Sequence, residues 1–145
     1  MQPRRENRRR LALIALAVYL LLAALVAFWP TPVDGPLGPK LAQLIHKLHN
    51  HGMPLWLGYD QVQFGANILF FIPLTFLLTL LLGRNRWGFA ALIGLAGSIC
   101  IEFIQGHFLT GRFSSIADVA ANTAGSLIGA LLARWWLVRR RHESD

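Results

Sequence analysis

Four long apolar blocks constrain the fold of this chain more than any other feature. A helix needs about 20 apolar residues to cross the hydrocarbon core of a bilayer. Four segments come close to that length: residues 11–29, 64–82, 88–105 and 117–138. Of the 145 residues, only 14% are charged, whereas an average soluble domain carries roughly a quarter. We therefore expect an all-α membrane protein with four transmembrane helices, and we treat residues 1–145 as one domain.

Basic residues mark one end of these spans. Most of them lie in the tail 1–10, in the connection 83–87 and toward the C-terminal tail 139–145. Only three fall in the two other loops: Lys40, Lys47 and Arg112. Because Lys and Arg are retained on the cytoplasmic side of short loops, both tails are predicted to be cytoplasmic. This topology also accounts for the net charge of +7, and no motif indicates a nucleic-acid partner.

The loop between the first two spans contains a second kind of helix. Apolar residues recur at helical spacing over residues 37–50, opposite Lys40 and Lys47. This pattern predicts a short amphipathic helix that lies at the outer membrane surface. His46, His49 and His51 raise a metal hypothesis, but no further ligand follows at a definite spacing. The single Cys100 allows neither an internal disulfide nor a thiolate metal site. We therefore expect no metal and no cofactor.

Polar residues interrupt the later spans at positions that the predicted topology places in the outer half of the membrane. They are Asn67, Glu102, Gln105, Asp118 and Asn122, with Arg112 in the adjoining loop. An unpaired carboxylate at bilayer depth costs about 3 kcal/mol on insertion scales. These side chains should therefore face one another, and they form the candidate binding cluster.

Small residues follow two helical stripes that indicate close packing. One stripe contains Ala90, Gly94, Ser98 and Glu102, and the other contains Asn122, Gly125, Gly129 and Ala133. Small residues let helix backbones approach closely where no hydrophobic force drives association. We expect the spans 88–105 and 117–138 to pack as an antiparallel hairpin. The GxxxG pattern at Gly125 and Gly129 leaves open a homo-oligomer.

The second half of the chain resembles a known family. The segment ANILFFIPLTFLL precedes the pattern E-x-x-Q, R, D-x-x-x-N-x-x-G-x-x-x-G, whose members are Glu102, Gln105, Arg112, Asp118, Asn122, Gly125 and Gly129. This combination is similar to the VanZ-like family of small bacterial membrane proteins. Thr75 stands where that family often has glycine. The resemblance implies a four-helix protein of the bacterial inner membrane and cell envelope, whose namesake confers antibiotic resistance by lowering susceptibility to the glycopeptide teicoplanin.

Two acidic residues allow both structural and functional interpretations. Asp118 follows Ser115 by three positions, as in a capping box, and an acid in a first turn is favoured by the helix dipole. Glu102 lies near the C-terminal end of its span, where an acid opposes the dipole. It could form an ion pair with Arg112, or it could serve as a ligand-binding or proton-handling group.

Three classes of function remain open. A binding or accessory protein would recognise membrane lipid, a lipid-linked envelope precursor or a lipoglycopeptide. An intramembrane enzyme would use Glu102 and Asp118 as an acid/base pair. A small transporter would use Glu102 as a coupling site. We favour the binding role over an enzyme, because the sequence has no Ser-His pair, metal-ligand motif or phosphate loop.

Overall fold

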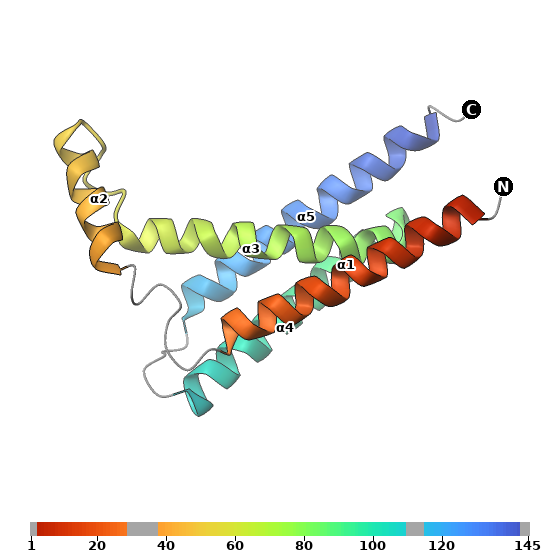
Figure 1. The fold of residues 1–145 in the computed structure, drawn as a ribbon, viewed down its shortest axis with the longest axis horizontal. Coiled ribbons are helices and arrows are strands. Elements are labelled where there is room, and N and C mark those ends of the chain that lie inside the picture. The colour runs from red at the N-terminus through yellow and green to blue at the C-terminus, as the bar shows by residue number, and fades with distance from the viewer. Residues whose placement is uncertain (1–2, 29–37, 110–114, 143–145) are drawn as a thin grey trace.

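The computed structural model describes residues 3–28, 38–109 and 115–142, in which helices are the only regular secondary structure (Figure 1). The elements in chain order are α1 (Pro3–Ala27), α2 (Gly38–Asn50), α3 (Tyr59–Leu82), the 3-10 turn η1 (Arg84–Arg86), α4 (Trp87–Phe108) and α5 (Ile116–His142). Four helices, α1, α3, α4 and α5, are long and apolar enough to span a membrane. The predicted all-α membrane fold is therefore confirmed.

Several helix boundaries differ from the predicted spans, most of all the starts of α1 and α3 and the end of α5. The basic N-terminal segment continues α1 back to Pro3, because proline suits the first position of a helix and arginine is a good helix former. Helix α3 begins at Tyr59 instead of residue 64, since the side chain of Gln61 accepts a hydrogen bond from the backbone N–H of Gly58 (2.9 Å) and closes the first turn. Helix α5 likewise runs on to His142.

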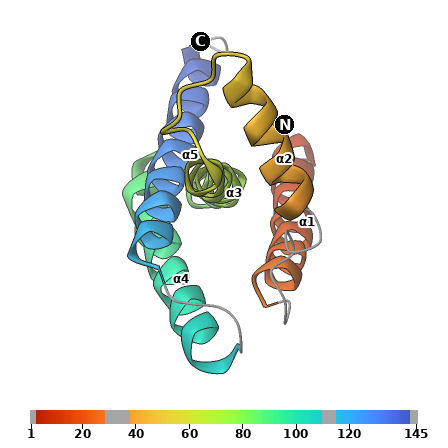
Figure 2. The same cartoon turned by 90° about the vertical axis from the view of Figure 1, so that its left-hand side faces the viewer.

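Helix α3 is the central element of the bundle. Figure 2 shows it end-on, with α5 and α4 on one side and α1 on the other. Its most extensive contact is with α5, and α1 packs mainly on α3. The hydroxyl of Tyr19 on α1 donates a hydrogen bond to the carbonyl of Phe70 on α3. Both termini lie at one end of the bundle, and α2 crosses the opposite end (Figure 1).

The core between α3, α4 and α5 is made of small and hydroxyl-bearing side chains. Phe71 is the one large apolar side chain that is fully buried in the described residues. The other buried positions on these helices include Thr75, Thr79, Ala90, Ser98, Ala121, Ser126, Ala130 and Ala133. Bulky aliphatic side chains face outward instead, as Leu69 (68% exposed) and Leu92 (61% exposed) show. This inversion is expected where lipid is the solvent, because close packing holds such helices together.

The two small-residue stripes pack differently from the prediction. Asn122 and Ser126 on α5 face α4, where they meet Ser98 and Gly94. A Cβ atom added at Gly125 or Gly129 would instead collide with the backbone of α3, at Ile68 and Ile72 respectively. The hairpin of α4 and α5 forms, but the GxxxG pair packs against α3. Helix α5 lies between α4 and α3 and needs one narrow face toward each of them. Asn122 and Gly125 are three residues apart and therefore lie on two adjacent faces of α5.

Thr75 occupies the space that these glycines leave. Its side chain is fully buried, and its hydroxyl donates a hydrogen bond to the carbonyl of Phe71 one turn earlier (3.0 Å). The side chain lies directly against the Cα positions of Gly94 on α4 and Gly129 on α5. The threonine is therefore accommodated at the junction of three helices because both of its neighbours lack a side chain.

Candidate functional site

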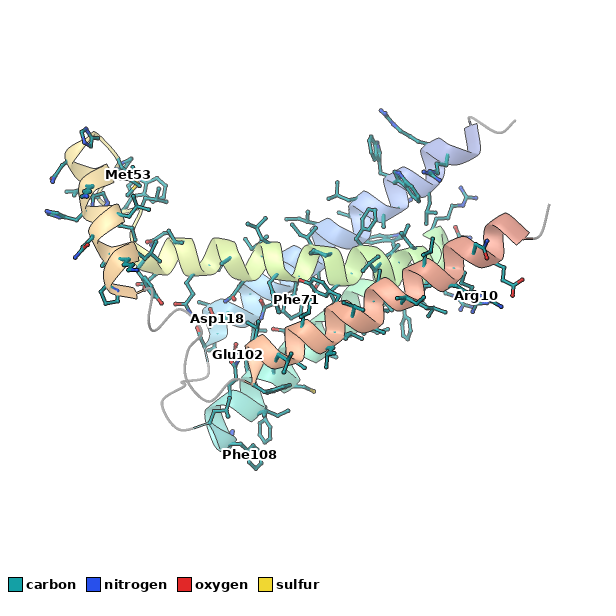
Figure 3. The ribbon with its side chains drawn as sticks, in the orientation of Figure 1. Arg10, Met53, Phe71, Glu102, Phe108 and Asp118 are labelled. Carbon is teal, nitrogen blue, oxygen red and sulfur yellow. The ribbon has the colours of Figure 1, made fainter. Side chains whose placement is uncertain are left out.

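The predicted polar cluster lies where α4 ends and α5 begins, beside the first half of α3 (Figure 3). Five of its six members are described by the structure: Asn67, Glu102, Gln105, Asp118 and Asn122. Arg112 lies outside the described residues, so its ion pair with Glu102 stays a prediction. Figure 3 shows Glu102 and Asp118 on neighbouring helices at this end of the bundle.

Asp118 joins α5 to α3. Its carboxylate accepts a hydrogen bond from the side-chain amide of Asn67 (Nδ2 to Oδ1, 2.8 Å). Both side chains are partly exposed. The bond links the first turn of α5 to the third turn of α3 and therefore orients two of the cluster's helices relative to each other.

Glu102 completes the N-terminal cap of α5 from a different helix. The hydroxyl of Ser115 accepts a hydrogen bond from the backbone N–H of Asp118 (3.3 Å), as in a capping box. In that motif the acid three residues on would accept the N–H of Ser115, but here Glu102 on α4 does so (Oε2, 2.8 Å). The carboxylate is 5% exposed and lies at the positive end of the α5 dipole. This position explains an acid that opposes the dipole of its own helix.

Asn122 is the deepest member of the cluster and is incompletely hydrogen-bonded. Its amide Nδ2 donates to the hydroxyl of Ser98 on α4 (2.9 Å), and the side chain is only 4% exposed. Its Oδ1 atom is buried and has no hydrogen-bond partner among the described residues. Leaving a buried acceptor unpaired costs about 1–3 kcal/mol, and such atoms are rare in folded proteins.

Gln105 belongs to a separate contact. Its Nε2 donates to the backbone carbonyl of Ala27 at the end of α1 (2.8 Å), and the side chain is buried. The last carbonyls of a helix have no partner within the helix. Gln105 therefore attaches the end of α1 to α4 and is not part of the network around Asp118 and Asn122.

The alternative of a metal site at the histidines of the first loop was disfavoured from the sequence. Within residues 3–28, 38–109 and 115–142, no three His, Cys, Asp or Glu side chains lie close enough to hold a metal ion. His49 on α2 instead contacts the carbonyl of Leu57 through Nε2 (3.1 Å). This contact folds the segment after α2 back onto that helix.

Two residues of this network, Ser98 and Ser115, were not predicted from the sequence to bond to the polar cluster. The sequence indicates Ser98 only as a small residue for helix packing, but its hydroxyl also accepts the hydrogen bond from Asn122. Its position one turn before Glu102 on the same face was a signal that could have identified it. Ser115 was predicted as a cap for its own helix, but nothing in the local sequence indicated that its N–H bonds to Glu102.

Comparison with known protein families places the chain beside one that the sequence already resembled. A family model described as VanZ/LLP1 matches residues 16–138, which includes every member of the polar cluster. No curated protein and no solved structure matches the chain significantly.

Proposed function

The chain belongs to the VanZ/LLP1 family, and from this premise we propose that it binds a component of the bacterial cell envelope at the outer end of the bundle. The binding cluster in this proposal consists of Asn67, Ser98, Glu102, Asp118 and Asn122. The protein is integral to the membrane, and the role that we assign is binding or accessory. The namesake's effect on teicoplanin susceptibility makes a lipoglycopeptide or a lipid-linked precursor the first class of ligand to test.

The proposed orientation follows from the distribution of basic residues. Arginines concentrate at the end of the bundle that carries both termini, whereas the cluster lies toward the end that α2 crosses (Figure 1). Because basic residues are retained in the cytoplasm, we assign the termini to the cytoplasmic side of the inner membrane. The cluster is then accessible from the outer side. Helix α2 would lie along the outer surface, with Leu55 and Trp56 beside it (84% and 71% exposed).

The unpartnered Oδ1 of Asn122 carries the proposal. This oxygen is a buried hydrogen-bond acceptor. Asp118, one turn earlier on α5, supplies a second acceptor, a carboxylate that is partly exposed. Acceptors at this position match a ligand group that donates hydrogen bonds, such as a hydroxyl, amide or amine. Sugars and peptides, the polar parts of lipid-linked precursors and lipoglycopeptides, are rich in these groups.

Binding is favoured over acid/base catalysis by how the two carboxylates are used. Glu102 accepts the N–H that caps α5, and Asp118 accepts the amide of Asn67. Each carboxylate therefore joins two helices. A group that must gain and lose a proton in every turnover would weaken the contact between its helices each time it became neutral.

A paired substitution tests the proposal without leaving a new unpaired group. Ser98→Ala with Asn122→Leu removes both partners of one buried hydrogen bond, and such replacements are close to neutral for stability. We expect the double variant to reach the membrane at the wild-type level. We expect mass spectrometry to detect a polar lipid in the gently purified wild-type protein and not in the double variant. The double variant should also lose any effect on lipoglycopeptide susceptibility in a host without an outer membrane.

Thr123→Val is the matched control. Its hydroxyl bonds within α5 to the carbonyl of Val119 (2.6 Å) and lies next to Asn122 in the sequence. This variant should keep both the lipid and the phenotype. If the double variant retains them as fully as the control, Asn122 does not contact a ligand and the proposal is wrong.

A further inference from the structure

Arginines surround α5 at the end of the bundle opposite the binding cluster. They are Arg84 and Arg86 on η1, and Arg134, Arg139 and Arg140 on α5, and we call them the arginine collar. The turn η1 contacts α5, so the two groups lie at the same end. All five side chains are exposed.

Three of these arginines lie over indole rings. The guanidinium of Arg140 is 3.8 Å from the centroid of Trp136, and that of Arg139 is 4.2 Å from Trp135. Arg134 extends from α5 to the first residue of α4, Trp87, at 5.4 Å. An aromatic face attracts a cation at these distances and holds the planar guanidinium parallel to the ring. The N–H groups on the rims of the Arg134 and Arg139 guanidiniums can then donate to a second partner.

No carboxylate in the described residues neutralises this charge at Arg84, Arg86, Arg134 or Arg139. The one ion pair between described residues joins Arg10 to Glu6 on α1 (3.1 Å). The other described acids, Asp60, Glu102 and Asp118, lie toward the opposite end of the bundle. Among the described residues, these four arginines therefore form a region of positive charge.

Exposed apolar side chains adjoin the collar on the side of the bundle centre. Trp135 is 53% exposed, and Leu131 and Leu132, one turn earlier on α5, are each 45% exposed. Phe89 near the start of α4 is 58% exposed. A partner that meets both surfaces must carry negative charge at one end and apolar chains at the other.

We propose that the arginine collar is a binding surface for anionic phospholipids, with the headgroup phosphate on the stacked guanidinium groups of Arg134 and Arg139 and the acyl chains along α4 and α5. Planar guanidinium groups bind phosphate oxygens through two parallel N–H donors, which a lysine ammonium cannot do. The surface is separate from the binding cluster, and neither proposal depends on the other.

The test compares phosphatidylglycerol with phosphatidylcholine added to the purified, delipidated protein, with bound lipid counted by native mass spectrometry. The wild type should prefer phosphatidylglycerol. In the double variant Arg134→Lys and Arg139→Lys the charge and hence the topology are kept, but the two stacked planar groups are lost. Its affinity for phosphatidylglycerol should fall by about two- to fivefold for each arginine replaced, with phosphatidylcholine binding unchanged.

Two further variants separate stacking from charge. Trp87→Leu with Trp135→Leu keeps every arginine but removes the rings under Arg134 and Arg139, and it should also weaken phosphatidylglycerol binding. Arg9→Lys with Arg10→Lys makes the same chemical change on α1, where no ring lies beneath either side chain among the described residues, and it should bind like the wild type. Circular dichroism and gel filtration verify that each variant is folded. Equal binding of the two lipids by the wild type, or undiminished phosphatidylglycerol binding by the folded lysine variant, would overturn the proposal.

Discussion

The packing of α5 on α3 makes a sharp prediction for Gly125→Ala. A Cβ atom at this position would meet the backbone of Ile68, with the carbonyl carbon and Cα each at 3.0 Å and the carbonyl oxygen closer still. Backbone atoms inside a helix cannot rotate away from the added methyl group. The two helices must therefore separate, and overpacking of this kind costs about 1–3 kcal/mol.

The intrinsic helix preference for alanine over glycine, about 1 kcal/mol, acts in the opposite direction and would hide part of this cost. Gly97→Ala on α4 provides the matched control, because a Cβ atom there has nothing within 4 Å. The helix preference is common to both variants. The difference between their free energies of unfolding should therefore report packing alone, and we expect Gly125→Ala to be less stable than Gly97→Ala by about 1–3 kcal/mol.

The assay is reversible unfolding of the purified protein in mild detergent, followed by circular dichroism for the wild type and both variants. Gly97→Ala should be at least as stable as the wild type. Equal stability of the two alanine variants would refute the close approach of α5 to α3. A stability loss that appears only in an oligomeric fraction would instead place Gly125 between two chains.

Three further predictions follow from the contacts at the helix ends. Glu102→Gln keeps an acceptor for the N–H of Ser115 and should remain folded, whereas Glu102→Leu leaves that N–H unpaired and should lower the free energy of unfolding by about 1–3 kcal/mol; equal stability of the two variants would contradict the cap. Gln105→Leu removes the donor to the Ala27 carbonyl and should speed hydrogen exchange at the end of α1 while leaving α5 protected; unchanged exchange would show that this contact does not hold α1. A reporter enzyme that is active only in the cytoplasm should be active when fused after Asp145, and a reporter that is active only in the periplasm should not; the opposite result would reverse the proposed topology.

The spans and the amphipathic helix could be predicted because the signals for them are local. A run of apolar residues such as 64–82 carries its own evidence for a membrane helix. The same is true of the amphipathic pattern over residues 37–50. The observed helix α2 begins at Gly38, one residue after the predicted start. Helix boundaries were less predictable. Helix α3, for example, begins at Tyr59, before its apolar run, because the side chain of Gln61 caps its first turn.

The candidate cluster was predictable as a set of residues but not as a set of bonds. Polar groups in apolar helices are costly, so the composition alone required Glu102, Asp118 and Asn122 to avoid lipid. Helical spacing also showed which residues share a face. It did not show which neighbouring helix lies against that face, so the packing of Gly125 on α3 could not be predicted.

The sequence by itself determined that this protein is a helical membrane protein with polar groups concentrated toward one end and arginines toward the other, because hydropathy and charge act residue by residue. The tertiary structure alone decided that α3 lies at the centre, that Glu102 caps α5 in place of Asp118, and that one oxygen of Asn122 is left without a partner among the described residues. These outcomes depend on how α3 and α4 pack against the two narrow faces of α5. This arrangement is a property of their mutual packing, and no single segment contains it.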